Sequence, residues 1–159
     1  MRHLIAAVVV AIVAICLAAP PAVADNGYPF PGTKVIPTPH GFGQLMQRLE
    51  QAIEDNQMGL VGRASASVGA SRRKLKIPGN AVFGVYRNDF AVRMLKASVP
   101  AGIEAPLRFY LTENADGTAT LTYRSPSAVF RPYASVELDA MAKELDTIFA
   151  AIARQAVAK

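Results

Sequence analysis

Residues 107–124 constrain the fold most, because polar and apolar side chains alternate there in two runs on either side of a turn signal. In the first run apolar Leu107, Phe109 and Leu111 alternate with Arg108, Tyr110 and Thr112; in the second Ala119, Leu121 and Tyr123 alternate with Thr118, Thr120, Thr122 and Arg124. Such alternation is typical of strands with one buried face. The Asn-Ala-Asp-Gly stretch between them favours a tight turn, so we expect an antiparallel hairpin.

The register of this hairpin follows from placing apolar residues opposite one another. A two-residue turn would set Thr112 opposite Leu121, a polar residue against an apolar one. A three-residue loop at residues 115–117 sets Leu111 opposite Leu121 and places Gly117 where such loops need a left-handed residue. Since a slip of one residue moves every side chain to the other face, we predict the three-residue loop.

Two long amphipathic helices are predicted, over residues 42–56 and 136–156, because apolar residues recur there at three- and four-residue spacing. Ser135 is a suitable N-cap for the second. A shorter helix is expected over residues 89–97, and the side chains it is expected to bury are Phe90, Met94 and Leu95.

Three further strands are predicted, over residues 33–36, 58–67 and 81–87. Pro37 is expected to end the first, because proline has no backbone N–H. Residues 69–76 have the composition of a polar, basic connector. Together with the hairpin, these elements predict an α+β fold with a single antiparallel sheet of about five strands and two long helices on one face.

The first 24 residues have the pattern of a signal peptide. A basic start is followed by an apolar run, and the run ends at a small-x-small site, Ala22-Val23-Ala24. We expect cleavage after Ala24, a linker over residues 25–32, and a single domain over residues 33–159 that is periplasmic or secreted. An uncleaved anchor is the alternative, but sixteen apolar residues span only about 24 Å of a ~30 Å hydrocarbon core.

Cleavage would also limit the chemistry of the mature chain. It removes Cys16, the only cysteine, and leaves His40 as the only histidine. Lipidation of Cys16 is disfavoured, since this residue lies inside the apolar run. A zinc site needs three or four ligands, and the sequence supplies none near His40. Met46, Met94 and Met141 fall in apolar stripes typical of core residues. We therefore predict no metal and no cofactor.

The predicted register places Arg108 and Arg124 directly opposite each other on the polar face, beside the pair Tyr110 and Thr122. Two guanidinium groups, a phenol and a hydroxyl make a cradle for an anion. The alternative is that both arginines point into water or pair with carboxylates elsewhere in the fold. The candidate anion-binding residues are Arg108, Tyr110, Thr122 and Arg124.

A second candidate site is the densest basic cluster, which consists of Arg72, Arg73, Lys74 and Lys76. Such a cluster favours contact with anionic lipid headgroups or an acidic partner, although a solvated loop is the alternative. It contains no aromatic residue, and nucleic acid is a poor partner outside the cytoplasm. We expect no nucleic-acid binding.

Catalytic motifs are scarce in this sequence. A Ser-His-acid triad would have to use His40, and no phosphate-binding glycine loop is present. Glu104, Glu113 and Asp116 are the carboxylates that would have to converge for acid–base chemistry. We predict no catalytic residue and expect a protein that is not an enzyme.

Several segments resemble the bacterial family known as domain of unknown function 302. They are Ala105 to Arg108 at a strand entry, the acidic-then-Asp-Gly hairpin from Glu113 to Gly117, and the aromatic-x-x-Pro segment from Tyr123 to Pro126. The first long helix also fits, so the resemblance covers essentially the whole mature chain. It implies a TATA-binding-protein-like sheet with helices on one side, and no established activity.

The resemblance has one departure. Many members carry an Asp-His pair in the strand after the first helix, where this chain has Arg63 to Ser67. No metal or acid–base role carries over to that position. The function we expect from the sequence is an exported binding domain for a small anionic ligand or a partner segment. The alternatives are an interaction module that docks on an envelope protein through its edge strand or basic loop, and an enzyme that acts through carboxylates alone.

Overall fold

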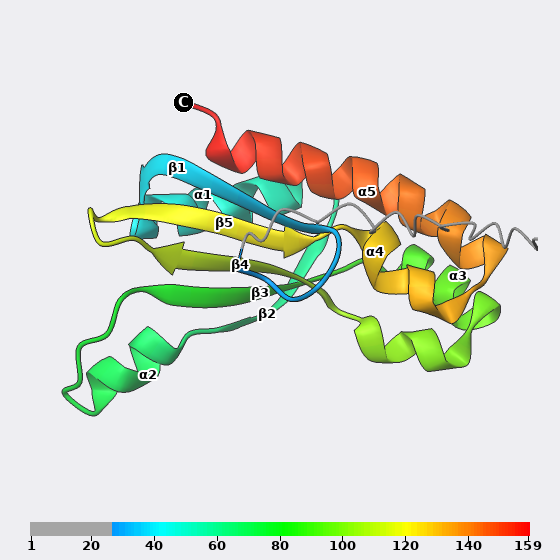
Figure 1. Ribbon diagram of the computed structural model, residues 1–159, viewed down its shortest axis with the longest axis horizontal. Coiled ribbons are helices and arrows are strands. Elements are labelled where there is room, and N and C mark those ends of the chain that lie inside the picture. The colour runs from blue at the N-terminus through cyan, green and yellow to red at the C-terminus, as the bar shows by residue number, and fades with distance from the viewer. Residues whose placement is uncertain (1–26) are drawn as a thin grey trace, which may run out of the picture.

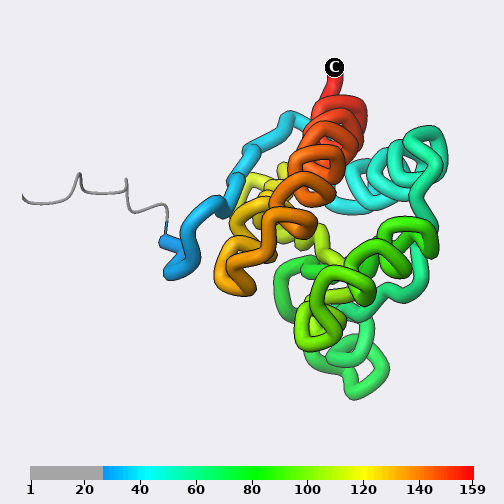
Figure 2. The backbone as a smooth tube through the Cα atoms, turned by 90° about the vertical axis from the view of Figure 1, so that its right-hand side faces the viewer, coloured from blue at the N-terminus to red at the C-terminus, as the bar shows by residue number. Residues whose placement is uncertain are grey.

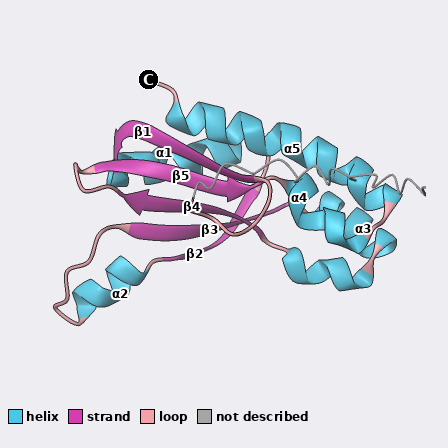
Figure 3. Cartoon of the chain, in the orientation of Figure 1, coloured by secondary structure: helices cyan, strands magenta, loops and turns pink. Residues whose placement is uncertain are grey.

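The computed structural model describes residues 27–159 (Figure 1). The predicted signal peptide, its cleavage site and Cys16 lie outside the described residues. Within them the chain forms one five-stranded antiparallel sheet with helices packed against it, which confirms the predicted fold class. Figure 3 shows the strands as one layer, with the long helices on one side of it.

The strands and helices follow one another along the chain as β1 (Thr33–Gly41), α1 (Phe42–Asp55), β2 (Gly59–Ala64), α2 (Ala66–Arg72), β3 (Asn80–Tyr86), α3 (Asn88–Ala97), the 3₁₀ helix η1 (Val99–Glu104), β4 (Leu107–Glu113), β5 (Thr118–Arg124), α4 (Pro126–Phe130), the 3₁₀ helix η2 (Arg131–Tyr133) and α5 (Val136–Val157). In space the strand order is β1-β5-β4-β3-β2, so β1 and β2 are the two edges.

The hairpin β4–β5 has the predicted register. Leu111 lies opposite Leu121, and Phe109 lies opposite Tyr123. The N–H of Asn114 donates to the carbonyl oxygen of Thr118 across a three-residue loop. Gly117 has a φ of +83°, the left-handed conformation that this loop requires. The binary pattern of the two strands was therefore sufficient to set their pairing.

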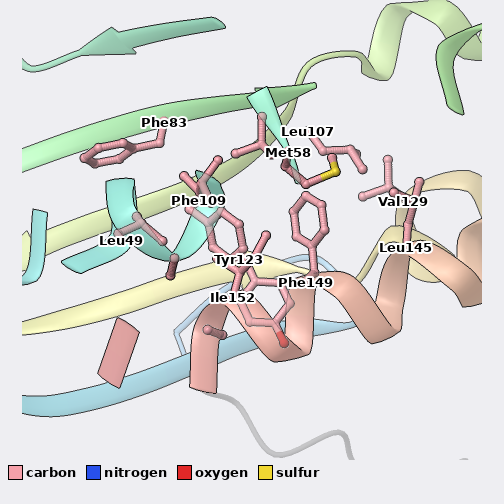
Figure 4. Packing of buried hydrophobic residues seen from close by; sticks show 14 of the residues in the cluster. Leu49, Met58, Phe83, Leu107, Phe109, Tyr123, Val129, Leu145, Phe149 and Ile152 are labelled. Carbon is pink, nitrogen blue, oxygen red and sulfur yellow. The ribbon is translucent and has the colours of Figure 1, made fainter. Parts of the chain in front are cut away.

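The core lies between the sheet and the helices α1 and α5 (Figure 4). Phe109 and Phe149 are fully buried, and their rings stack with centroids 4.7 Å apart and planes inclined by 14°. Tyr123 packs at a tilt against Phe109, with centroids 5.1 Å apart. The residues that alternate inward along β4 and β5 thus meet the apolar stripe of α5, as the predicted amphipathic pattern requires.

The middle of α1 is joined to the C-terminal end of α5 by hydrogen bonds from Arg48 to the last carbonyl groups. Arg48 on α1 donates to the carbonyl oxygens of Ala156 (2.8 Å), Ala158 (2.7 Å) and Gln155 (3.3 Å). The Nε2 atom of His40 lies 2.7 Å from the same Ala158 oxygen. A cation at this position also complements the negative end of the helix dipole. The two sequence-distant helices are therefore held together at one end.

The prediction that Pro37 ends the first strand is wrong. β1 runs on to Gly41, with Pro37 opposite Thr120 and a register shift between Pro37 and Gly41. β1 is an edge strand, so the missing N–H of proline removes no bond from a second neighbour.

Two other predictions are also corrected. Half of the segment 69–76, predicted as a connector, belongs to α2. The N-cap of this helix is Ser65, whose side chain accepts a hydrogen bond from the N–H of Val68. This helix has only seven residues, too few for a recognisable apolar stripe. Leu95 is 46% exposed, because α3 buries the stripe of Phe90, Ala91 and Met94, and Leu95 lies beyond its edge.

The methionines Met58, Met94 and Met141 line one small apolar cavity of about 30 Å³ under α3. All three are buried among hydrophobic neighbours, which agrees with the core role predicted for Met94 and Met141. A search of the described helices finds none that is both long and apolar enough to cross a membrane.

Candidate anion-binding site

The face of the sheet opposite α1 and α5 carries the arginines Arg108 and Arg124. Successive strand residues point to opposite faces, and Leu107, Phe109 and Leu111 point into the core. Arg108 and Tyr110 therefore lie on the outer face, where Tyr110 is paired with Thr122. The register thus places all four residues predicted for anion binding on one face of two neighbouring strands.

Arg108 and Arg124 line the same pocket, which has a volume of about 60 Å³. The other two lining residues are Leu107, at the start of β4, and Val129 of α4. The pocket therefore has two guanidinium groups and an apolar remainder. Its size suits a single carboxylate or phosphate group rather than a whole metabolite.

Neither arginine of this pocket is neutralised by a carboxylate within residues 27–159, where the ion pairs involve other side chains. The Nη2 atom of Arg124 donates to the carbonyl oxygen of Ala128 at 3.4 Å. Its Nε atom is buried and has no hydrogen-bond partner among the described residues. A buried donor without an acceptor costs about 1–3 kcal/mol, so the site favours a ligand that supplies one.

The aromatic ring of Phe30 packs on the guanidinium group of Arg124. The guanidinium carbon of Arg124 lies 5.0 Å from the ring centroid of Phe30, within the range of a cation–π contact. This contact stabilises the position of the guanidinium group and leaves its positive charge in place. It also shields one side of the guanidinium group from water, which strengthens its attraction for an anion.

Tyr110 and Thr122 are the next pair on the same face, two residues along each strand, and are not lining residues of the pocket. Thr122 is buried, and its hydroxyl lies 3.4 Å from the hydroxyl of Tyr28. The structure therefore places the two arginines together, and the phenol and hydroxyl of the predicted cradle beside them rather than around the same cavity.

Residues 27–32, predicted as part of a linker, pass across β5 and β4 on this face (Figure 1). They are held at Gly32, whose carbonyl oxygen accepts a hydrogen bond from the N–H of Ser125. Gly32 has a φ of +76°, and a Cβ atom there would lie 2.3 Å from the Cβ of Ala128. Only glycine fits this crossing, which holds residues 27–32 beside Ser125 at the end of β5.

Sequence reasoning missed Phe30 and Val129 as neighbours of the arginines, and Tyr28 as a neighbour of Thr122. Tyr28 and Thr122 are separated by 94 positions, and no periodic pattern links them. The only sequence signal was the Tyr-Pro-Phe-Pro-Gly composition of the segment, where two aromatic residues stand in an otherwise turn-forming stretch.

The basic cluster lies apart from the arginine pocket. Arg72 ends α2, and Arg73, Lys74 and Lys76 follow it; all four are exposed. The strand that follows them, β3, begins at Asn80 opposite Thr112, whereas Arg108 lies four residues before Thr112 in β4. Four strand residues span about 13 Å, so the cluster and the pocket are separate surfaces.

The three carboxylates considered for acid–base chemistry do not converge. Glu104 precedes β4 and accepts a hydrogen bond from the hydroxyl of Tyr133, whereas Glu113 lies at the other end of that strand. Glu113 accepts from the N–H of Gly79. Hydrogen bonds from Thr118 lower the pKa of Asp116, the opposite of what a general acid requires.

His40 occupies the end of β1 and is buried, with its Nε2 atom at the Ala158 carbonyl. Within residues 27–159 no three His, Cys, Asp or Glu side chains are grouped so that they could hold a metal ion. This histidine thus has a structural contact at the end of α5.

The comparisons with known families and with solved structures both lead to the same family. Residues 34–156 match the family Domain of unknown function DUF302. The solved structures that resemble the chain include an uncharacterised conserved DUF302 protein from Bacillus stearothermophilus, with 16% sequence identity and a TM-score of 0.68. The alignment covers 78% of this chain and 98% of that one, and at this identity it shows a shared fold. A search of curated proteins finds no match. Because the family match spans most of the sequence, the chain belongs to the DUF302 family.

Proposed function

We propose that this protein is an exported binding domain that holds a small carboxylate or phosphate anion between Arg108 and Arg124. The observation that carries the proposal is the buried Nε atom of Arg124, which has no acceptor within residues 27–159 and belongs to a side chain that lines a pocket with a second arginine. The export follows from the signal-peptide pattern of the first 24 residues.

The charges that line the pocket support an anionic ligand. Two like charges on directly neighbouring strands repel each other, and an anion between them removes this repulsion. A guanidinium group donates in a planar fork that matches a carboxylate or phosphate in a bidentate manner. An anion that accepts from both arginines therefore gains two charge-assisted interactions and satisfies the buried donor.

The apolar part of the pocket narrows the ligand class. Leu107 and Val129 offer no donor or acceptor from their side chains, so the body of the ligand is apolar where it meets them. The volume of about 60 Å³ is enough for the charged head alone. The rest of the ligand would therefore extend beyond the pocket. Short-chain carboxylates and organic phosphates have this form.

Thermal unfolding in the presence of different anions tests the proposal. The sodium salts of chloride, acetate, succinate, phosphate and a short alkyl phosphate are compared at one ionic strength. An anion at ten times its Kd raises the Tm by about 4 °C. Arg108→Ala abolishes this rise, whereas Arg131→Ala, which removes an exposed cation of η2, keeps it.

Two results would overturn the proposal. One is that no carboxylate or phosphate salt raises the Tm above the value in chloride. The other is that Arg108→Ala and Arg131→Ala respond to every stabilising anion as the wild type does, because the effect would then come from net charge and not from the pocket.

A further inference from the structure

The surface that carries the basic cluster is a projecting arm, residues 65–78, which consists of α2 and the loop that follows it. We refer to it as the basic arm. Figure 1 shows α2 standing away from the helices that cover the sheet, and Figure 2 shows it at the lower end of the molecule, apart from α5. Its one buried apolar side chain is Ala70, and α2 packs on β3. Most of the arm is therefore free to meet another surface.

The charge of the basic arm is entirely positive. It contains Arg72, Arg73, Lys74 and Lys76, and no acidic residue occurs anywhere between residues 56 and 87. None of these four cations forms an ion pair with a residue in the described part of the chain. A block of four cations without counter-charges attracts an anionic surface and repels a basic one.

Exposed aliphatic side chains accompany these cations. Val68 and Leu75 are each 54% exposed and Ile77 is 44% exposed. In the stretch Lys74 to Ile77, charged and aliphatic residues alternate strictly. A solvated loop gains nothing from such residues, because each exposed aliphatic side chain keeps apolar surface in water.

The backbone of the basic arm is ordered by hydrogen bonds at the end of α2. The N–H of Lys74 donates to the carbonyl oxygen of Ser71 at 2.9 Å, and the N–H of Leu75 donates to that of Ala70 at 3.0 Å. With Lys74 at a φ of +60°, this pair of bonds is a Schellman motif. The cations and the aliphatic side chains are thus presented on a fixed turn.

We propose that the basic arm is a docking surface for an anionic phospholipid bilayer. The interface of such a bilayer offers phosphate groups to the four cations and, about 5–10 Å deeper, an apolar layer to Leu75 and Ile77. Stable attachment to a membrane surface needs two signals of different kinds, and the arm supplies a polybasic one and an apolar one. The arm lacks aromatic residues for base stacking, which disfavours single-stranded nucleic acid.

Sedimentation with vesicles tests this surface directly. The protein is expressed from the full-length gene, recovered in the form that the cell produces, and its N-terminal residue is determined. Vesicles of phosphatidylcholine alone are compared with vesicles that contain phosphatidylglycerol. We expect binding to the anionic vesicles alone, with a decrease as sodium chloride is raised, because salt screens exposed charges.

Two sets of variants separate the arm from the net charge of the protein. Replacing all four cations of the basic arm by glutamine lowers the partition coefficient by more than about a hundredfold, at about fivefold for each cation. The matched control replaces four exposed cations outside the arm by glutamine: Lys96, Arg131, Lys143 and Arg154. The control set has the same net charge, and we expect its binding to stay within about threefold of the wild type.

The apolar signal is tested in the same way. Leu75→Ser with Ile77→Ser weakens binding to anionic vesicles about tenfold or more, since about 0.8 kcal/mol per buried methylene is lost. Val92→Ser with Val136→Ser, which removes exposed aliphatic side chains from α3 and α5, leaves it unchanged. The Tm of each variant is measured, so that loss of folding is distinguished from loss of binding.

Three outcomes would overturn the proposal. The first is equal binding of the arm variant and the charge-matched control. The second is a dimer in sedimentation velocity that dissociates when Leu75 and Ile77 are replaced, without binding to vesicles, which would assign the arm to a second copy. The third is binding to a soluble acidic polypeptide such as polyglutamate with no binding to vesicles.

Discussion

Arg108 and Arg124, on neighbouring strands of the hairpin, line one pocket, and neither has a carboxylate partner within residues 27–159. Adjacent like charges on a sheet cost a few tenths to about 1 kcal/mol. A second free-energy cost arises at the same place, because the Nε atom of Arg124 is buried without an acceptor among the described residues. An anion bound between the two arginines, as we propose, would remove both costs.

The crossing of residues 27–32 over this face depends on Gly32. Replacing it by alanine places a Cβ atom 2.3 Å from that of Ala128 and 2.7 Å from the Oγ of Ser125, at a φ of +76°. We expect Gly32→Ala to lower the free energy of unfolding by about 2 kcal/mol or more, measured by urea denaturation. Gly117→Ala is the control, since its φ is +83° but no atom lies within 4 Å of the added carbon. Equal losses in the two variants would show that Ala128 does not restrict this crossing.

Arg48 ties the end of α5 to α1. Its removal leaves three carbonyl groups without their charged donor, so Arg48→Ala should lower the free energy of unfolding by about 1–3 kcal/mol. Amide exchange in the last turn of α5 should accelerate as well. Lys143→Ala removes an exposed cation from α5 and should change the stability by less than about 0.5 kcal/mol. A loss for Arg48→Ala as small as this would contradict the capping role.

Phe149 of α5 packs on the hairpin through ring contacts with Phe109 and Tyr123. Phe149→Ala removes the stacked partner of Phe109 from a fully buried site, and we expect a loss of about 3–5 kcal/mol in chemical denaturation. Phe149→Leu keeps most of the apolar volume and should cost about 1–2 kcal/mol. If both substitutions cost less than 1 kcal/mol, the core does not lie where we place it.

Stability should decrease in acid through two exposed carboxylates. A hydrogen bond from Arg93 lowers the pKa of Glu144 in the folded protein, and one from Arg87 lowers that of Asp89. Each unfolded carboxylate therefore binds its proton at a higher pH than the folded one does. Their contribution is present above the ordinary values of 4.5 and 3.8 and is lost as the pH falls through the lower folded pKa values.

Urea denaturation between about pH 5 and pH 2.5 measures this effect. The double variant Glu144→Gln with Asp89→Asn should show a smaller decrease over this range than the wild type, because neither side chain then titrates. Identical pH profiles for the two proteins would contradict the role of these ion pairs.

The sequence predicted most accurately those elements whose pattern is local. The alternation in β4 and β5 determined their register, and the apolar stripes of α1 and α5 placed both helices. Pro37 was misjudged because its tolerance depends on β1 being an edge strand, which is a property of the sheet order. The seven residues of α2 are too few to show a stripe, and their only local signal was the N-cap Ser65.

The same distinction between local pattern and tertiary packing applies to the residues of the candidate site. Arg108 and Arg124 were predicted because the hairpin brings them together through local pairing. Phe30 and Val129 were not, since their approach to Arg124 depends on how residues 27–32 and α4 pack at the end of the sheet. The buried Nε atom of Arg124 is likewise a result of tertiary packing, and no pattern in the sequence indicates it.

The most direct test of the anion site is the NMR signal of the arginine Nε–H groups during titration with inorganic phosphate. The signal of Arg124 is assigned from its absence in Arg124→Lys. We predict that the Arg108 and Arg124 signals shift and saturate with one common Kd, that Arg131 and Arg154 do not shift, and that Arg108→Ala removes the response of Arg124. Shifts that are equal for all arginines and rise linearly without saturation would contradict the account.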